Sequence, residues 1–173
     1  MVFRLNIKKA NGLVEVKEDL PPDEFYKNHE LTLRKQGTHI SYSSTLFHRI
    51  YNATQQHNAS KIWYAIDKAG QIHSAIFIVF DSKSAFFVIS SIDPDFRNSG
   101  ATSLLVFRAI EYLKSYTNRF DFEGSMIEGV ESSFRHFGAK QVPYFVINKA
   151  SYIVESLLAC RQYYIKKVKK THS

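Results

Sequence analysis

The chain has 173 residues, which is enough for one domain of ordinary size. Hydrophobic residues make up 45% and charged residues 23%, close to globular averages, which argues against wholesale disorder, collagen and a coiled coil. The net charge of +7 is basic, and no apolar run approaches the ~18 residues that a membrane-spanning helix needs. The first residues lack an apolar stretch of signal-peptide length, and the single Cys160 cannot form an internal disulfide, so we expect a soluble protein of the cytoplasm.

The first half of the chain predicts two helices and three strands. Residues 1–16 alternate basic and apolar positions and predict no clear element. A Pro and two acids predict that a helix begins at 22 and runs to 35, and Ser43 or Ser44 can cap a second helix that runs to about residue 54. Runs of β-branched and aromatic residues separated by short turns then predict an antiparallel meander with a buried middle strand, at 61–67, 71–80 and 85–91.

The second half predicts alternating helices and strands. Apolar residues at helical spacing predict a long helix over 103–114. Further segments follow as a strand at 119–123, a helix at 126–137, a strand at 144–148 and a helix at 151–168. This order predicts an α/β fold in which helices flank a mixed, mostly antiparallel sheet. We expect a lead-in segment at 1–20 and a single domain over 21–173.

A basic tail ends the chain, with no acid after Glu155. Its five cations are Arg161, Lys166, Lys167, Lys169 and Lys170. Such a tail can associate with tRNA or with an anionic lipid surface, because neutralising phosphates drives that association. The alternative is a solvated helix end whose cations suit the negative pole of the helix.

The junction between the third strand and the long helix has the residues of an anion site. Small residues meet a helix start there, and the free N–H groups of a first helical turn can bind a pyrophosphate. The segment reads Arg97, Asn98, Ser99, Gly100, Ala101 and Thr102. The alternative is that Ser99 or Thr102 simply caps the helix.

This junction resembles the coenzyme A pyrophosphate loop of the GNAT acyltransferase superfamily, Arg-x-x-Gly-x-(Gly/Ala), with Thr102 in place of the last Gly or Ala. Residues 120–129, 134–139 and 144–145 look like the C-terminal lobe of GNAT-like proteins related to FemAB, and 5–10 looks like the basic segment between their two lobes. The resemblance covers about 34–149 and implies a GNAT-like fold and N-acyl transfer to an amine. The donor that it implies is acetyl-CoA or another acyl-CoA bound by 97–102, with aminoacyl-tRNA as the alternative donor.

The acceptor that the resemblance implies is a small-molecule amine or an amine of a peptidoglycan precursor. Many GNAT enzymes carry a Tyr that acts as general acid, and the corresponding position holds Phe134. The alternative function is therefore a non-catalytic lobe that docks a partner or supports a larger FemAB-like protein. Oligomeric state is not determined by the sequence, and a homodimer stays open.

Two carboxylates are the candidate catalytic residues. Asp121 and Glu123 are two apart on a short predicted strand, so they point to the same face, and Glu123 precedes Gly124 at a strand-to-loop end where clefts open. A partly buried Glu123 would suit the general base that takes the amine proton. The alternative is that Glu123 only organises the loop. A metal site is not expected, because no His pair with a carboxylate has the spacing of a zinc motif.

Overall fold

The computed structural model describes residues 2–124 and 128–143, together with residues 149, 151, 152, 154, 156, 158 and 160. Across these described residues, no helix is both long and apolar enough to cross a membrane. The chain divides into two compact units, Met1–Lys140 and Gln141–Ser173. In the second unit, the hydroxyl of Ser156 donates to the carbonyl oxygen of Tyr152 at 2.8 Å. The predicted strand at 144–148 and most of the predicted helix at 151–168 lie outside the described residues.

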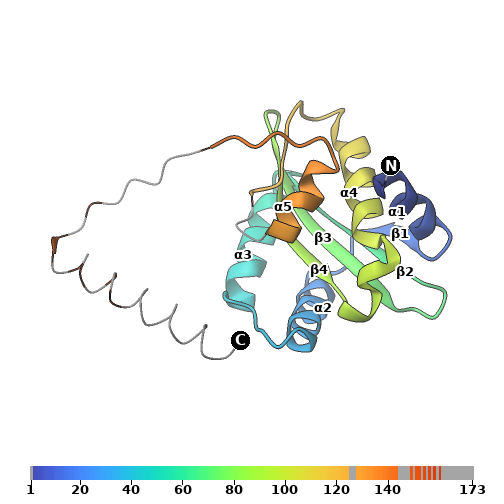
Figure 1. The fold of residues 1–173 in the computed structure, drawn as a ribbon, viewed down its shortest axis with the longest axis horizontal. Helices are drawn as coiled ribbons and strands as arrows, with labels where there is room; N and C mark the ends of the chain where they lie inside the picture. Colours follow the sequence, from blue (N-terminus) through green and yellow to red (C-terminus); the bar gives the residue numbers. More distant parts are fainter. Residues whose placement is uncertain are drawn as a thin grey trace. The chain divides into compact units, whose positions relative to one another are not determined.

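The first unit is built on a five-stranded sheet in the order β1-β2-β3-β4-β5 (Figure 1). Neighbouring strands are antiparallel, except that β5 is parallel to β4. The strands are β1 (Glu15–Glu18), β2 (Ser60–Ile66), β3 (Ile72–Phe80), β4 (Ala85–Ile92) and β5 (Phe120–Asp121). The helices are α1 (Val2–Asn11), α2 (Pro22–Lys35), α3 (Ser44–Gln55), the 3₁₀ helix η1 (Pro94–Ser99), α4 (Ala101–Leu113) and α5 (Glu128–Arg135).

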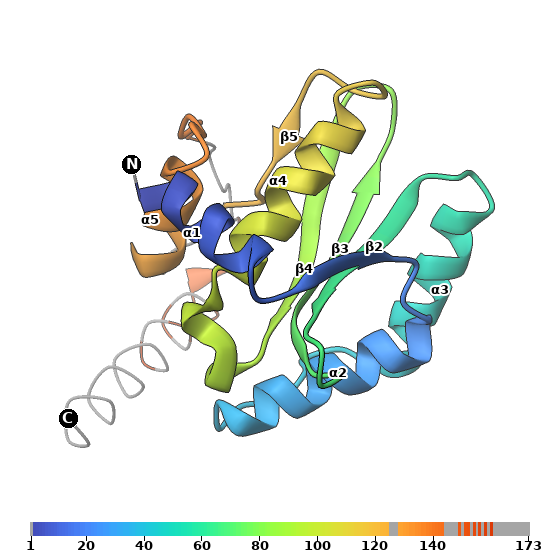
Figure 2. The same cartoon turned by 90° about the vertical axis from the view of Figure 1, so that its right-hand side faces the viewer.

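Helices cover both faces of this sheet, and each face has its own apolar core. On the face covered by α2 and α3, Phe25, Phe47 and Phe77 are almost completely buried. On the opposite face, α4 buries Leu104 against Ile76 of β3, and α1 and α5 lie on the same side as α4 (Figure 2). β3 contributes to both cores because successive side chains of a strand point to opposite faces.

The elements predicted between residues 22 and 114 are confirmed. α2 begins at Pro22 with two acids in its first turn, and the Ser43 hydroxyl caps α3 by accepting the N–H of Leu46 at 3.2 Å. The predicted meander of β2, β3 and β4 is antiparallel, and its middle strand is buried. α4 begins at Ala101, two residues earlier than predicted, directly after the turn at Gly100. The mixed α/β class is confirmed as well.

The prediction of no regular element in residues 1–16 was wrong. These residues form α1 and part of β1, and β1 pairs along β2 from Glu15 to Glu18. Ile7, Ala10 and Val14 pack against the core beneath α4, and Ala10 is fully buried. Because the helix is short and half of its positions are polar, its stability comes from this packing and not from its own sequence. The likeness of 5–10 to a connector between lobes stays a prediction.

The aromatic core under α2 and α3 predicts a large effect of one truncation. The Phe77 ring lies 5.6 Å from that of Phe47 and 6.3 Å from that of Phe25, measured between centroids. We expect Phe77→Ala to lower the free energy of unfolding by about 3–5 kcal/mol, because it removes a buried ring and leaves a cavity. Leu46→Ala, at an exposed position of α3, should change it by less than about 0.5 kcal/mol. Denaturant unfolding of both variants measures this, and equal effects would contradict the assigned core.

Candidate functional site

The outer edge of β4 is open over most of its length. β5 pairs with β4 only at Ala85 and Phe86. Beyond Phe86, β4 continues to Ile92 with no further pairing to β5, and no other described strand pairs with it on that side. The ladder with β3 skips Val88, which stands in β4 as a β-bulge. An open edge presents unpaired N–H and C=O groups, so a ligand can bind along it.

The turn after β4 is held by α2. The Asp93 carboxylate accepts the N–H of Asp95 at 3.0 Å and so caps η1. Lys35, the last residue of α2, donates to Asp93 and to Asp95, each at 2.7 Å. Hydrogen bonds to Asp93 and Asp95 raise the pKa of Lys35, so its ammonium stays charged around neutral pH. The end of α2 is therefore tied to the segment that leads into α4.

A buried histidine packs against the same turn. The ring of His73 stacks on that of Phe96 with centroids 3.8 Å apart and an angle of 4° between the planes. Its Nε2 lies 3.2 Å from the carboxylate of Asp67, and its backbone carbonyl accepts the N–H of Asp93 at 3.1 Å. Hydrogen bonds to Asp67, first from the backbone of Gln71 and then from His73, lower the pKa of that carboxyl. No sequence motif pointed to this pair.

The six predicted donor residues span the end of η1 and the first turn of α4. Gly100 has φ +80° and ψ 4°, a left-handed conformation that glycine adopts without steric cost. The buried Ser99 accepts the N–H of Ala101 at 3.2 Å. The Thr102 hydroxyl lies 2.9 Å from that of Ser74, so this side chain is held against β3. Arg97 and Asn98 are exposed.

The first turn of α4 can hold an anion. Gly100 offers no side chain to cap it. Helix geometry leaves the N–H groups of the first turn without intrahelical acceptors, and Ser99 satisfies only that of Ala101. The N–H groups of Thr102 and Ser103, at the positive end of the helix dipole, can therefore donate to a phosphate.

Helix α1 also contacts this turn, which the sequence analysis missed. Lys9 donates its ammonium to the carbonyl oxygen of Asn98 at 2.6 Å. A Cβ added at Gly100 would lie 2.5 Å from the carbonyl oxygen of Asn6, so the absence of a side chain at Gly100 lets α1 approach. The signal in the sequence was the spacing of Ile7 and Ala10, which places two apolar residues on one face of the helix.

The two predicted catalytic carboxylates lie at the other end of β4 from this turn. Asp121 pairs with Phe86, about seven strand residues or roughly 20 Å from the start of the turn. Its carboxylate accepts from Arg119 at 2.7 Å and from the N–H of Glu123 at 2.9 Å. Glu123 is exposed and has φ +61°, so the partial burial assumed for a base is absent. The structure therefore does not bring the carboxylates together with the six donor residues.

Phe134, which the resemblance placed at the position of a general-acid Tyr, belongs to an aromatic cluster. Its ring stacks on that of Phe122 at 4.6 Å and meets the ring of Phe87 edge-on at 6.3 Å, measured between centroids. α5 thus covers the start of the open region of β4 with apolar rings.

On the opposite face of β4, a cluster of hydrogen-bonded polar side chains lies under α2. The Ser91 hydroxyl donates to the amide oxygen of Asn28 at 2.8 Å and lies 3.0 Å from the Thr32 hydroxyl. Burial lowers the pKa of His29 and raises that of Tyr42 to about 12. His29 is therefore neutral near pH 7, and Tyr42 keeps its proton.

Within the described ranges, no three His, Cys, Asp or Glu side chains are grouped so that they could hold a metal ion.

Several solved acetyltransferases share the fold of this chain. The chain matches a predicted acetyltransferase from Clostridium acetobutylicum, solved with acetyl-CoA, at a TM-score of 0.64 and 12% identity, covering 79% of this chain and 96% of that one. It matches glucosamine-6-phosphate N-acetyltransferase from Arabidopsis thaliana at a TM-score of 0.57 and 14% identity, covering 79% and 99%. No protein-family model and no curated protein sequence matches the chain.

FemX is a further structural match, with a TM-score of 0.65 and 10% identity. The match covers 77% of this chain and 52% of FemX, so the chain spans about half of that protein. At these identities the likeness is one of fold. The chain has the fold of the GNAT acetyltransferases, as the resemblance implied.

The contact between Gly100 and α1 predicts unequal costs for two glycine substitutions. Gly70 has φ +83° and nothing within 4 Å of an added Cβ, whereas Gly100 has a similar φ and the Asn6 carbonyl in the way. Gly70→Ala should lower the free energy of unfolding by about 1–2 kcal/mol, the cost of the left-handed conformation. Gly100→Ala should cost about 1–3 kcal/mol more, because α1 must shift. Denaturant unfolding compares them, and equal losses would show that α1 does not press on Gly100.

Proposed function

We propose that this chain transfers an acyl group from an acyl-CoA, with acetyl-CoA as the first candidate, to an amine. The observation that carries the proposal is that the open edge of β4 leads, through η1, to the first turn of α4, whose free N–H groups can hold an anion. The GNAT fold supports it, since one structural match was solved with acetyl-CoA.

The donor would lie along β4. Its pyrophosphate would accept from the N–H groups of Thr102 and Ser103, with the exposed guanidinium of Arg97 close by in sequence. Its pantetheine arm would extend back along the open edge. Val88 lies four residues before Ile92, or about 13 Å along the strand. The acyl group would then reach the bulge.

The reaction needs a polarised thioester and a deprotonated amine. The bulge frees the N–H of Val88 from the ladder with β3, so this N–H can donate to the thioester carbonyl oxygen as negative charge develops there. The amine nitrogen forms a bond to the carbonyl carbon, and the bond from that carbon to sulfur breaks. The amine loses one proton, and the coenzyme A thiolate takes one up.

Glu123 is the base in this proposal. Phe134 stands where a Tyr would protonate the leaving thiolate. Asp121 pairs with Phe86, two residues before the bulge at Val88, and Glu123 follows Asp121 just beyond the end of β5. An exposed carboxylate there can pass the amine proton to water. With Phe134 in place of a Tyr, the thiolate would take its proton from solvent.

The acceptor is proposed only as a class. One structural match is named for N-acetylation of glucosamine-6-phosphate, and the FemX match keeps an amine of a peptidoglycan precursor as a candidate. Aminoacyl-tRNA stays the alternative donor. The basic tail is the segment that would contact the tRNA.

A second candidate function is a docking lobe without catalysis. It is favoured by α1, whose Asn6 carbonyl and Lys9 ammonium lie on the turn that would bind the donor. Phe134 favours it too, because its ring fills space where an acid would be needed. The two candidates differ in whether the folded chain binds acetyl-CoA.

Calorimetric titration with acetyl-CoA tests the proposal. We expect micromolar binding to the wild-type chain and about tenfold weaker binding to Arg97→Gln, a loss of about 1.4 kcal/mol, because a cation beside the phosphates is removed. Gly100 is unsuitable for this test because its substitution disturbs α1.

The matched control is Arg49→Gln, which removes an exposed cation of α3 on the opposite face of the sheet. It should bind acetyl-CoA like the wild type. If the folded wild-type chain does not bind acetyl-CoA, the acyl-CoA proposal fails, and the docking lobe or the aminoacyl-tRNA donor takes its place.

A further inference from the structure

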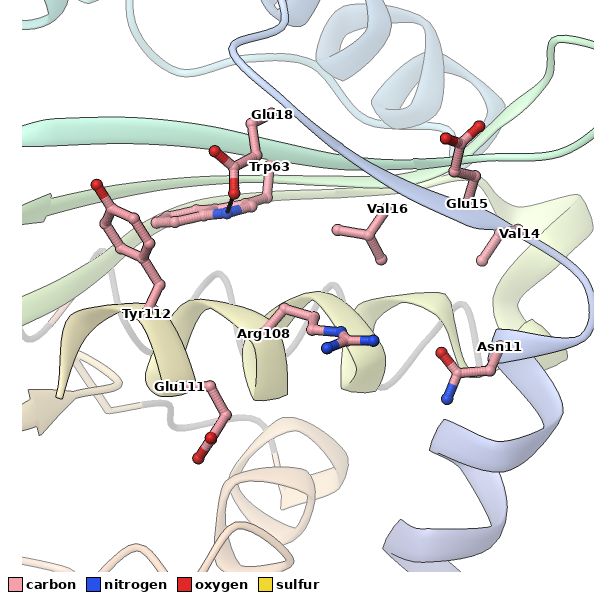
Figure 3. A pocket seen from close by; sticks show the side chains of 9 residues that line it. All are labelled: Asn11, Val14, Glu15, Val16, Glu18, Trp63, Arg108, Glu111 and Tyr112. Atoms are coloured by element: carbon pink, nitrogen blue, oxygen red, sulfur yellow. Dashed lines mark hydrogen bonds between the residues drawn. The ribbon is translucent and has the colours of Figure 1, made fainter.

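A cavity lies at the edge of the sheet farthest from the proposed acyl-transfer site. It has a volume of about 620 Å³ and opens between β1 and α4 (Figure 3). β1 is the first strand of the sheet and β5 the last, so this cavity and the open edge of β4 are separated by the width of the sheet. A volume of this size is typical of pockets that bind small molecules.

The floor of the cavity is apolar and aromatic. Val14 and Val16 point into it from the chain around β1, and Trp63 of β2 lies beneath (Figure 3). Tyr112 of α4 meets the Trp63 ring edge-on, with centroids 5.6 Å apart. The Trp63 side chain is almost fully buried, and its indole N–H donates to the carboxylate of Glu18 at 3.2 Å. Its polar atom is therefore satisfied, and the partly exposed apolar side chains of the cavity are those of Val16 and Tyr112.

The acids around the cavity are all paired with lysines. Glu18 pairs with Lys61 at 2.6 Å. The other pairs are Glu15 with Lys17 at 3.4 Å and Glu111 with Lys114 at 2.8 Å. Burial opposes the charge of Lys61, but the hydrogen bond to Glu18 and the negative charges of Glu18 and Asp19 together outweigh it, so the pKa of Lys61 is raised. The ammonium of Lys61 lies 4.8 Å from the centre of the Tyr112 ring, so a cation already fills the aromatic end.

Arg108 is the cation of this cavity for which the described residues provide no ion pair or hydrogen bond. Its guanidinium points along α4 into the space below β1, toward the side chain of Asn11 at the end of α1 (Figure 3). A guanidinium binds a carboxylate through two parallel hydrogen bonds, and an amide N–H can add another.

We propose that this cavity binds a small organic carboxylate with an apolar body. The carboxylate would accept hydrogen bonds from Arg108 and Asn11, and the body would lie over the partly exposed side chains of Val16 and Tyr112. Charge complementarity selects the anion, since the acids of the cavity are already neutralised and Arg108 is not. The site is independent of acyl transfer, because none of its residues belongs to β4, to the turn after it or to β5.

The test uses the full chain and the fluorescence of Trp63, the single tryptophan. 4-Phenylbutyrate is the probe, and 4-phenylbutyramide is the uncharged probe of the same shape. We expect a saturable change in Trp63 emission with the carboxylate and binding of the amide weaker by about tenfold or more, because hydrogen bonds to a charged group are lost. Arg108→Gln should weaken carboxylate binding by a similar factor.

Arg49→Gln, which changes a distant exposed arginine, is the matched control and should leave the titration unchanged. Far-ultraviolet circular dichroism establishes that each variant is folded. The proposal is overturned if the carboxylate gives no saturable change, if the amide binds as tightly, or if Arg108→Gln binds like the wild type. This test does not use acetyl-CoA, so the carboxylate-site proposal and the acyl-CoA proposal can be refuted independently of each other.

Discussion

β5 pairs with β4 at only two positions, and the arrangement of the candidate active site follows from this short ladder. After Phe86 the edge of β4 has no partner strand among the described residues, and the bulge at Val88 frees a further N–H within that stretch. Backbone groups of an open edge must be satisfied by water or by a ligand. Because β4 then leads through η1 into α4, the same edge ends at a helix N-terminus that suits a phosphate. A longer β5 ladder would pair the edge of β4 and leave no open backbone groups for a ligand along it.

Helix α1 contacts both the turn before α4 and the cavity beside β1. Its Asn6 carbonyl and Lys9 ammonium contact the turn before α4, while Asn11, at its end, lines the cavity beside β1. Gly100 therefore meets two demands, a left-handed backbone and a close helix approach, and neither requires a nucleotide. For this reason a glycine in the Arg-x-x-Gly pattern is weak support for coenzyme A binding in this chain, and the open edge of β4 is stronger support.

Much of the fold could be predicted from the sequence, because residues 22–114 combine strong local signals. Pro22, Ser43 and the run of β-branched and aromatic residues along β3 each identified an element. α1 was missed because Ile7 and Ala10 form too short a pattern to predict a helix, and the helix depends on packing against α4, which is a tertiary effect. Residues 97–102 lie at the predicted junction between strand and helix, but their contacts with Asn6, Lys9 and Ser74 join segments far apart in the chain. Likewise the exposure of Glu123 and the cavity at Arg108 depend on how the strands pair, which no local pattern encodes.

The central claim is that an acyl-CoA binds along the open edge of β4, and amide hydrogen exchange measures this directly. Exchange would be followed for each segment of the folded chain with and without saturating acetyl-CoA. The account predicts slower exchange in residues 87–92 and 97–103, where backbone N–H groups would gain acceptors, and unchanged exchange in β1. Protection confined to β1 and the cavity beside α4, or no protection at all, would contradict it.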